Sequence, residues 1–172
     1  MKFPQEEYDW IVGTLERIEF LTPDPNQMEN YRSDMAMLAD SMIKETIENG
    51  EPVIVEGQKA GSFYIIRSGR AGVWINREGE RVKVASLGPG SCFGEISLLT
   101  GGPCTATVTA EAGSMDVYRL RPKIFQGVLK SNPRLQGKLS DLMQKRLSEQ
   151  KAVVEILEKK RIEGDRPEEG NG

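Results

Sequence analysis

Residues 94–108, GEISLLTGGPCTATV, decide the fold of this chain. Gly94 allows a sharp backbone turn, and the residues after it can form one turn of helix whose first N–H groups lack internal partners. Such groups attract an anion, while the carboxylate of Glu95 can accept hydrogen bonds from a sugar hydroxyl. Two glycines and Pro103 end the turn, and a β-prone run from Thr105 returns toward the same space. The segment therefore predicts a tight turn that approaches a small ligand closely.

Short β-prone runs separated by glycines surround this segment between residues 52 and 120. They are rich in Val, Ile, Phe, Tyr and Thr, and they cover residues 53–55, 62–67, 72–75, 81–87, 105–110 and 115–120. Glycine suits the corners between them because it adopts positive φ without steric cost. Short strands at this spacing are typical of an antiparallel sandwich or barrel.

Helical periodicity flanks the β-rich part on both sides. Apolar residues recur at helical spacing over residues 6–20 and 34–47, which predicts two N-terminal helices. Residues 123–130 predict a short C-terminal helix, and Pro133 suits the first turn of a long helix that runs to residue 163. The Glu- and Gly-rich residues 164–172 predict a disordered tail.

One apolar stripe follows the long C-terminal helix, with polar Gln150 interrupting it. The stripe consists of Leu139, Met143, Leu147, Val154 and Leu157. It fits a helix that packs on its own domain. It also fits a homodimer helix, because the stripe is longer than a small β-roll can cover.

Residues 94–108 resemble the phosphate-binding cassette of cyclic-nucleotide-binding domains. Residues 48–73, ENGEPVIVEGQKAGSFYIIRSGRAGV, resemble the first strands of the same family, including Gly57, the Tyr64-Ile65-Ile66 strand and the Ser68-Gly69 corner. The two motifs occur in the correct order, and the match covers residues 21–146. The resemblance implies an α+β fold: an antiparallel β-roll, or double-stranded jelly roll, flanked by N-terminal helices, a short cassette helix and C-terminal helices.

The predicted organisation has four parts. They are an N-terminal helical segment at 1–47, the β-roll at 48–121 with the cassette-like segment 93–108, C-terminal helices at 122–163 that can act as a lid or a dimer helix, and the tail at 164–172.

The resemblance also implies a ligand site in the cassette. Its residues are Phe93, Gly94, Glu95, Ile96, Ser97, Cys104, Thr105 and Ala106. In this interpretation Glu95 binds the ribose 2′-hydroxyl, and Thr105 lies beside the phosphate as in family members that favour guanine. The region of Val73 and the C-terminal helix cover the base. The alternative is a purely structural role, in which Glu95 only caps its own helical turn and the glycines only form the turns of the roll.

The chain departs from the cassette at Cys104, where the family has an arginine that pairs with the phosphate. A thiol is a weak donor and does not neutralise an anion. Loss of an arginine–phosphate contact costs on the order of 2–5 kcal/mol of binding free energy. Arg67, Arg70 and Lys123 are the candidates for a substitute cation. Cys104 itself can be a small buried filler or a redox sensor.

The functional prediction is a regulatory, non-catalytic sensor module. Its candidate ligand is cAMP or cGMP, it needs no cofactor, and binding repositions the C-terminal helix. Because Cys104 removes the cation, we expect binding to be weak or to lean toward cGMP. The alternative is a degenerate fold that binds no cyclic nucleotide and serves as an interaction or dimerisation scaffold.

Composition excludes several other classes. The 172 residues include no histidine and only two cysteines, which argues against catalytic triads, zinc sites and cupin-type metal enzymes, and favours reduced thiols. A net charge of −3 and a short C-terminal region argue against a nucleic-acid partner. No apolar run approaches the roughly 18–20 residues that span a bilayer, and the N-terminus lacks a signal peptide. A cytoplasmic location is the resulting expectation.

Overall fold

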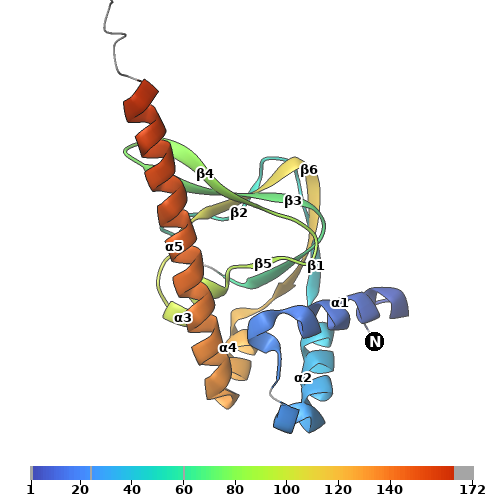
Figure 1. Ribbon diagram of the computed structural model, residues 1–172. Coiled ribbons are helices and arrows are strands. Elements are labelled where there is room, and N and C mark those ends of the chain that lie inside the picture. The colour runs from blue at the N-terminus through green and yellow to red at the C-terminus, as the bar shows by residue number, and fades with distance from the viewer. Residues whose placement is uncertain (1, 24, 60, 165–172) are drawn as a thin grey trace, which may run out of the picture.

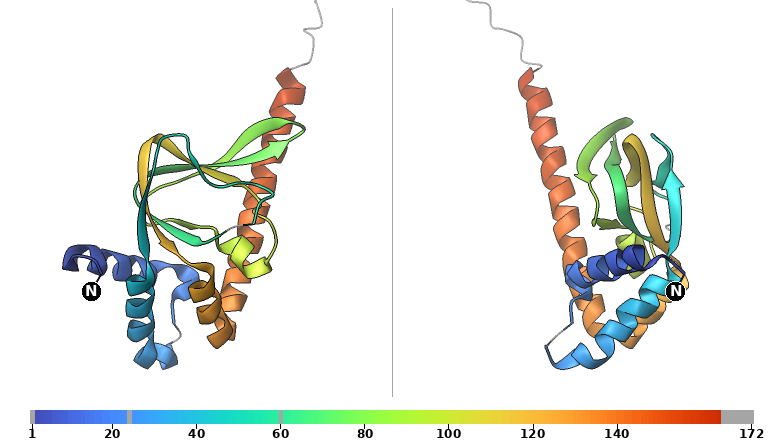
Figure 2. Two further views of the ribbon diagram at one scale, coloured as in Figure 1. Left: turned by 180° about the vertical axis from the view of Figure 1, so that it is seen from behind. Right: turned by 90° about the vertical axis from the view of Figure 1, so that its right-hand side faces the viewer.

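The computed structural model describes residues 2–23, 25–59 and 61–164 of the chain. Helices α1, α2 and α4 gather at one end of a rolled sheet, and the long helix α5 runs along one side of it (Figure 1). Figure 2 shows the same arrangement from behind and from the side, with α5 lying outside the roll. The helical elements are α1 (Gln5–Arg17), η1 (Glu19–Leu21), η2 (Pro25–Gln27), α2 (Met28–Ser41), α3 (Glu95–Thr100), α4 (Pro122–Ser131) and α5 (Pro133–Gly164).

Two long antiparallel strands carry the sheet. The strands are β1 (Ile43–Ile47), β2 (Pro52–Ile54), β3 (Phe63–Arg77), β4 (Glu80–Leu87), β5 (Cys92–Phe93) and β6 (Thr107–Leu120). Their order is β1-β6-β3-β4, while β2 also pairs with β6 and β5 with β3. The predicted α+β fold with an antiparallel β-roll and flanking helices is therefore confirmed.

The predicted pairs of short runs at 62–67 and 72–75, and at 105–110 and 115–120, are wrong as separate strands. Each pair forms one continuous strand, β3 or β6, that bends at its middle. The register between them shifts on both sides of Ser68, next to Gly69 with φ +84°. A Cβ at Gly69 would lie 2.6 Å from the carbonyl oxygen of Ser114 on β6. Glycine thus lets the strands cross closely at the corner without ending the strand.

The N-terminal helices differ from the prediction at their ends. The helix α1 stops at Arg17, and η1 replaces the last predicted turn. The second predicted helix is wrong beyond Ser41, because residues 43–47 form β1, with Ile43 opposite Arg119 and Ile47 opposite Met115. The alternating exposure along β1 has the period of a strand. The predicted division into 1–47 and 48–121 stays a prediction, although its first part includes this strand.

Two apolar clusters hold the domain together. One lies between the helices and the end of the roll that they cover, where the rings of Phe63 and Phe125 stack with centroids 5.1 Å apart. The other fills the roll, where Tyr64 stacks on Phe93 at 4.9 Å. Because α5 contributes Leu139 to the first cluster and Val154 to the second, the helix is anchored at two separated points.

The C-terminal helices agree with the prediction in position, with α4 and α5 covering residues 122–131 and 133–164. Leu139 and Val154 of the predicted dimer stripe are buried in their own domain, whereas Leu157 is 41 % exposed. The stripe therefore packs on its own domain as far as Val154. Homodimer formation stays a prediction, and the predicted tail lies outside the described residues beyond Gly164. Among the described helices, none is long and apolar enough to cross a membrane.

Candidate functional site: a ligand cavity inside the roll

Gly94 makes the turn that starts the site. It follows β5 with φ +89°, and a Cβ there would lie 2.4 Å from the carbonyl oxygen of Ser62. No other residue type fits this position without moving the backbone. The short helix α3 begins directly after it and ends at Thr100, and the N–H of the capping residue Gly101 donates to the carbonyl of Ser97 at 2.9 Å. The Ser97 hydroxyl donates to the carbonyl of Gly102 at 2.7 Å. The predicted turn of helix between glycines is confirmed.

The segment after α3 is fixed by backbone hydrogen bonds to the loop that precedes β3. The N–H of Cys104 donates to the carbonyl of Gln58 at 2.7 Å, and the N–H of Gly57 donates to the carbonyl of Cys104 at 2.9 Å. This two-way pairing places Thr105 and Ala106 beside α3. The two sequence motifs, at 48–73 and 94–108, are therefore joined directly in space.

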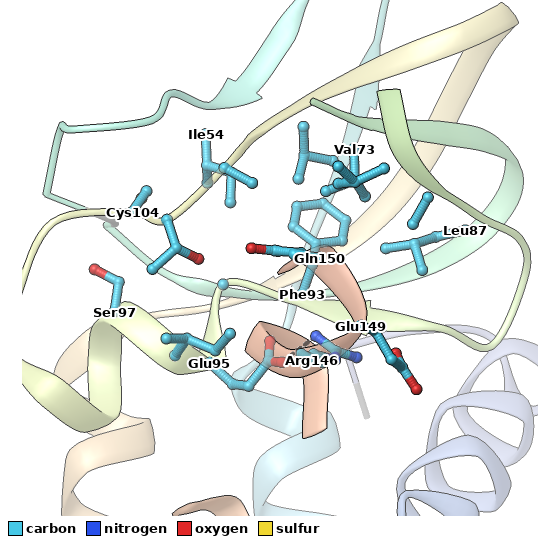
Figure 3. A pocket seen from close by; sticks show the side chains of 17 residues that line it. Ile54, Val73, Leu87, Phe93, Glu95, Ser97, Cys104, Arg146, Glu149 and Gln150 are labelled. Atoms are coloured by element: carbon cyan, nitrogen blue, oxygen red, sulfur yellow. Dashed lines mark hydrogen bonds and ion pairs between the residues drawn. The ribbon is translucent and has the colours of Figure 1, made fainter. Parts of the chain in front are cut away.

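All eight predicted site residues line one cavity of about 140 Å³ inside the roll (Figure 3). The remaining lining comes from the sheet and from α5: Ile54, Val73, Val84, Ala85, Leu87, Val108, Arg146, Glu149 and Gln150. Both regions expected to cover a base, around Val73 and on the C-terminal helix, take part. The structure brings these residues together, and their binding to a ligand stays a prediction.

An ion pair joins the cassette to α5 at the floor of the cavity. The side chain of Glu95 is only 1 % exposed, and its Oε1 accepts a hydrogen bond from Nη1 of Arg146. Nη2 of the same guanidinium donates to the carbonyl of Cys92 at 3.0 Å. Burial raises the pKa of Glu95 above its ordinary value, and the Arg146 guanidinium opposes that rise. The cassette and α5 are thus coupled through one buried carboxylate.

The second carboxylate oxygen of Glu95 is buried without a hydrogen-bond partner in the described part of the chain. A buried acceptor left unpaired costs about 1–3 kcal/mol. This oxygen therefore favours any ligand that brings a donor, such as a hydroxyl group, into the cavity.

Arg146 was not among the residues that the sequence predicted. A signal for it existed, because Arg146 and Gln150 lie four residues apart and interrupt the apolar face of the same helix. The three proposed substitute cations were wrong: Arg67, Arg70 and Lys123 do not line the cavity. The guanidinium of Arg67 lies over the ring of Trp10 instead, 4.6 Å from its centroid. Arg146 is the single basic side chain that lines the cavity among the described residues.

A family model described as "Cyclic nucleotide-binding domain" matches residues 44–132. The chain belongs to this family. The chain is also 30 % identical over 122 residues to a cAMP-dependent protein kinase type II regulatory subunit of Drosophila melanogaster. That match covers 71 % of this chain and 30 % of the relative, so the chain spans only about a third of that protein's length. The relative is named as a regulatory subunit and not as a catalytic enzyme.

Solved structures show the same fold. The regulatory domain of Toxoplasma gondii protein kinase A with cAMP superposes with a TM-score of 0.63 at 25 % identity, covering 84 % of this chain and 51 % of that one. A regulatory subunit of a cAMP-independent protein kinase A from Trypanosoma cruzi, bound to guanosine, superposes with a TM-score of 0.64 at 21 % identity, covering 90 % and 51 %. The fold of this chain thus belongs to a known architecture.

Within this cyclic nucleotide-binding domain the cassette cysteine is uncharged. Cys104 is 5 % exposed, and burial raises the pKa of its thiol, although a hydrogen bond with Ser97 opposes the rise. Cys92 is also buried, and burial raises its pKa to about 12. Both cysteines are free thiols, in agreement with the expectation of reduced thiols. The cavity therefore offers a phosphate no unpaired cation in the described part of the chain.

Proposed function

We propose that this domain is a regulatory sensor that binds a purine ligand in the cavity and binds cAMP or cGMP weakly. One observation carries the proposal: the one basic side chain that lines the cavity among the described residues is already paired with Glu95. The resemblance to the family cassette puts Cys104, which also lines the cavity, in the place of the phosphate-binding arginine. Loss of a buried charge partner costs on the order of 2–5 kcal/mol, which corresponds to a roughly 30- to several-thousand-fold weaker affinity. A lean toward cGMP rests on Thr105, which lines the cavity beside Cys104.

We further propose that ligand binding is transmitted through α5, and the size and lining of the cavity support this. Its volume of about 140 Å³ lies below the roughly 300 Å³ at which small-molecule sites begin. Three of its lining side chains belong to α5: Arg146, Glu149 and Gln150. We propose that a ligand of nucleotide size displaces α5 from this position. A ligand shifts the equilibrium between the two positions of α5 only by the difference in its affinity for them.

The relatives support this proposal in two ways. The Drosophila melanogaster protein is named as a cAMP-dependent regulatory subunit, which supports a signalling role without catalysis. The Trypanosoma cruzi protein is named as cAMP-independent and holds guanosine, so a domain of this fold can take a purine ligand that is not a cyclic nucleotide.

Calorimetric titration with cAMP and cGMP tests the proposal. The wild-type domain should bind with a Kd above about 1 μM, and Cys104→Arg should tighten binding at least about tenfold. Cys104→Ala is the matched control, because it removes the thiol without adding charge, and its affinity should equal that of the wild type. If Cys104→Arg melts like the wild type and its affinity is unchanged, the assignment of the cassette to the phosphate is wrong.

A second candidate function, a scaffold for dimerisation, is favoured by the end of α5. Ile156, Leu157 and Ile162 are 55 %, 41 % and 68 % exposed beyond the last buried residue, Val154. A second copy of α5 could cover them. Light scattering tests this by measuring the molar mass. The wild-type chain should have the mass of a dimer, and the variant with both Leu157→Glu and Ile162→Glu should have the mass of a monomer. If the wild-type chain is monomeric at all concentrations tested, it is not a dimerisation scaffold.

A further inference from the structure

We propose that the cavity prefers an uncharged purine nucleoside to the cyclic nucleotide of the same base. This inference rests on the proposed function, since it names the class of ligand for the same cavity. Three features of the cavity support it: its charge, its unpaired acceptor and its size.

The first feature is the charge balance of the lining. Glu95 and Glu149 bring two carboxylates, and Arg146 brings one guanidinium that Glu95 already binds. Within the cassette, the Cys104 thiol is uncharged and the Ser97 hydroxyl donates to the carbonyl of Gly102. A cyclic phosphate would add a negative charge to a site that has no unpaired cation among the described residues. Desolvating an anion without a partner is costly, whereas a nucleoside brings no charge to desolvate.

The second feature is the unpaired Oε2 of Glu95, which is buried and needs a donor. In a cyclic nucleotide the 3′ and 5′ oxygens of the ribose are esterified, so only the 2′-hydroxyl can donate. A nucleoside carries free hydroxyls at the 2′, 3′ and 5′ positions. It therefore offers two further donors to a carboxylate that is itself held in place by Arg146. A buried unpaired carboxylate oxygen with no unpaired cation beside it matches a polyol better than a phosphate.

The third feature is the shape of the rest of the cavity. Its roll side is apolar, with Val73, Leu87 and Phe93 facing the space between the sheet and α5 (Figure 3). Such a surface suits the flat face of a purine. Because the cavity is small, a ligand without phosphate requires a smaller displacement of α5 than a nucleotide does.

Calorimetry on the full chain tests this with adenosine, guanosine, cAMP and cGMP at low and at raised NaCl. Each nucleoside should bind the wild type at least about tenfold tighter than the cyclic nucleotide of its base, and its affinity should not change with salt. A 5′-deoxynucleoside is the matched control ligand and should bind more weakly than the parent nucleoside. Cys104→Arg should reverse the order, tightening the cyclic nucleotide without tightening the nucleoside.

The outcomes separate this inference from the proposed function. If the wild type binds a cyclic nucleotide as tightly as the nucleoside, or tighter, the nucleoside preference is wrong and the sensor function stands. If the wild type binds neither class while Cys104→Arg binds the cyclic nucleotide, the preference is again wrong and the cassette assignment stands. If neither protein binds either class, both the preference and the sensor function are overturned.

Discussion

The buried pair of Glu95 and Arg146 gives the sharpest test of how α5 is held. Arg146→Met keeps most of the side-chain volume but removes the guanidinium, so it leaves a carboxylate that is 1 % exposed without its partner. Removing one member of a buried pair costs about 3–5 kcal/mol. Because the Arg146 side chain is itself 26 % exposed, we expect about 3 kcal/mol, the lower end of that range.

A double-mutant cycle with Glu95→Gln isolates the interaction free energy between Glu95 and Arg146, because the glutamine amide leaves no buried charge when Arg146 is removed. In that background Arg146→Met should cost at most about 1 kcal/mol, which includes the lost hydrogen bond to the Cys92 carbonyl. Urea unfolding at pH 8 measures both losses. Arg161→Met is the matched control on the same helix, since its contact with Glu80 is 3.5 Å long and both side chains are exposed. Its effect should stay within about 0.5 kcal/mol.

The pH dependence of this variant has a definite sign. Burial raises the pKa of Glu95, and loss of Arg146 removes the contact that opposes the rise. A native pKa above the unfolded value means that the native state binds more protons in that window, so stability falls as pH rises. The penalty of Arg146→Met should therefore be smaller at pH 5 than at pH 8. Equal losses in both backgrounds, or a penalty that grows at pH 5, would refute the coupling of α5 to the cassette through this carboxylate.

Further predictions concern the turn, the anchoring of α5 and the thiols. Gly94→Ala should lose at least about 2 kcal/mol in urea unfolding, because a Cβ there meets a carbonyl oxygen at 2.4 Å, whereas Gly88→Ala, with open space around its Cβ, should stay near the wild type. Leu139→Ala should cost about 2–5 kcal/mol because the side chain is fully buried, and Leu157→Ala, at 41 % exposure, should cost less than about 1 kcal/mol. Cys92 should react with a thiol reagent only after the chain is unfolded, since it is buried and its pKa is raised to about 12. Rapid labelling in native buffer would contradict that last prediction.

How much could be predicted from the sequence depends on the range of the contacts involved. The cassette turn was predictable because Gly94 and Gly101 specify it within a few residues. The strand at 43–47 was not, because Ile43 and Ile47 fit helical and strand spacing alike, and only their pairing with Arg119 and Met115 decides between the two. The continuity of β3 and β6 likewise depends on a bend that forms only when the two strands meet.

The role of Arg146 was hidden for the same reason, since its partner Glu95 lies 51 residues earlier in the chain. This contact changes the meaning of Cys104. From the sequence alone, a missing arginine leaves a site with one cation too few, for which another basic residue could compensate. In the structure the nearest basic side chain is committed to Glu95, so using it for a phosphate would strand a buried carboxylate. A cation added at position 104 avoids that cost, which is why Cys104→Arg, and not a rearrangement of Arg146, is the change expected to restore tight binding of a cyclic nucleotide.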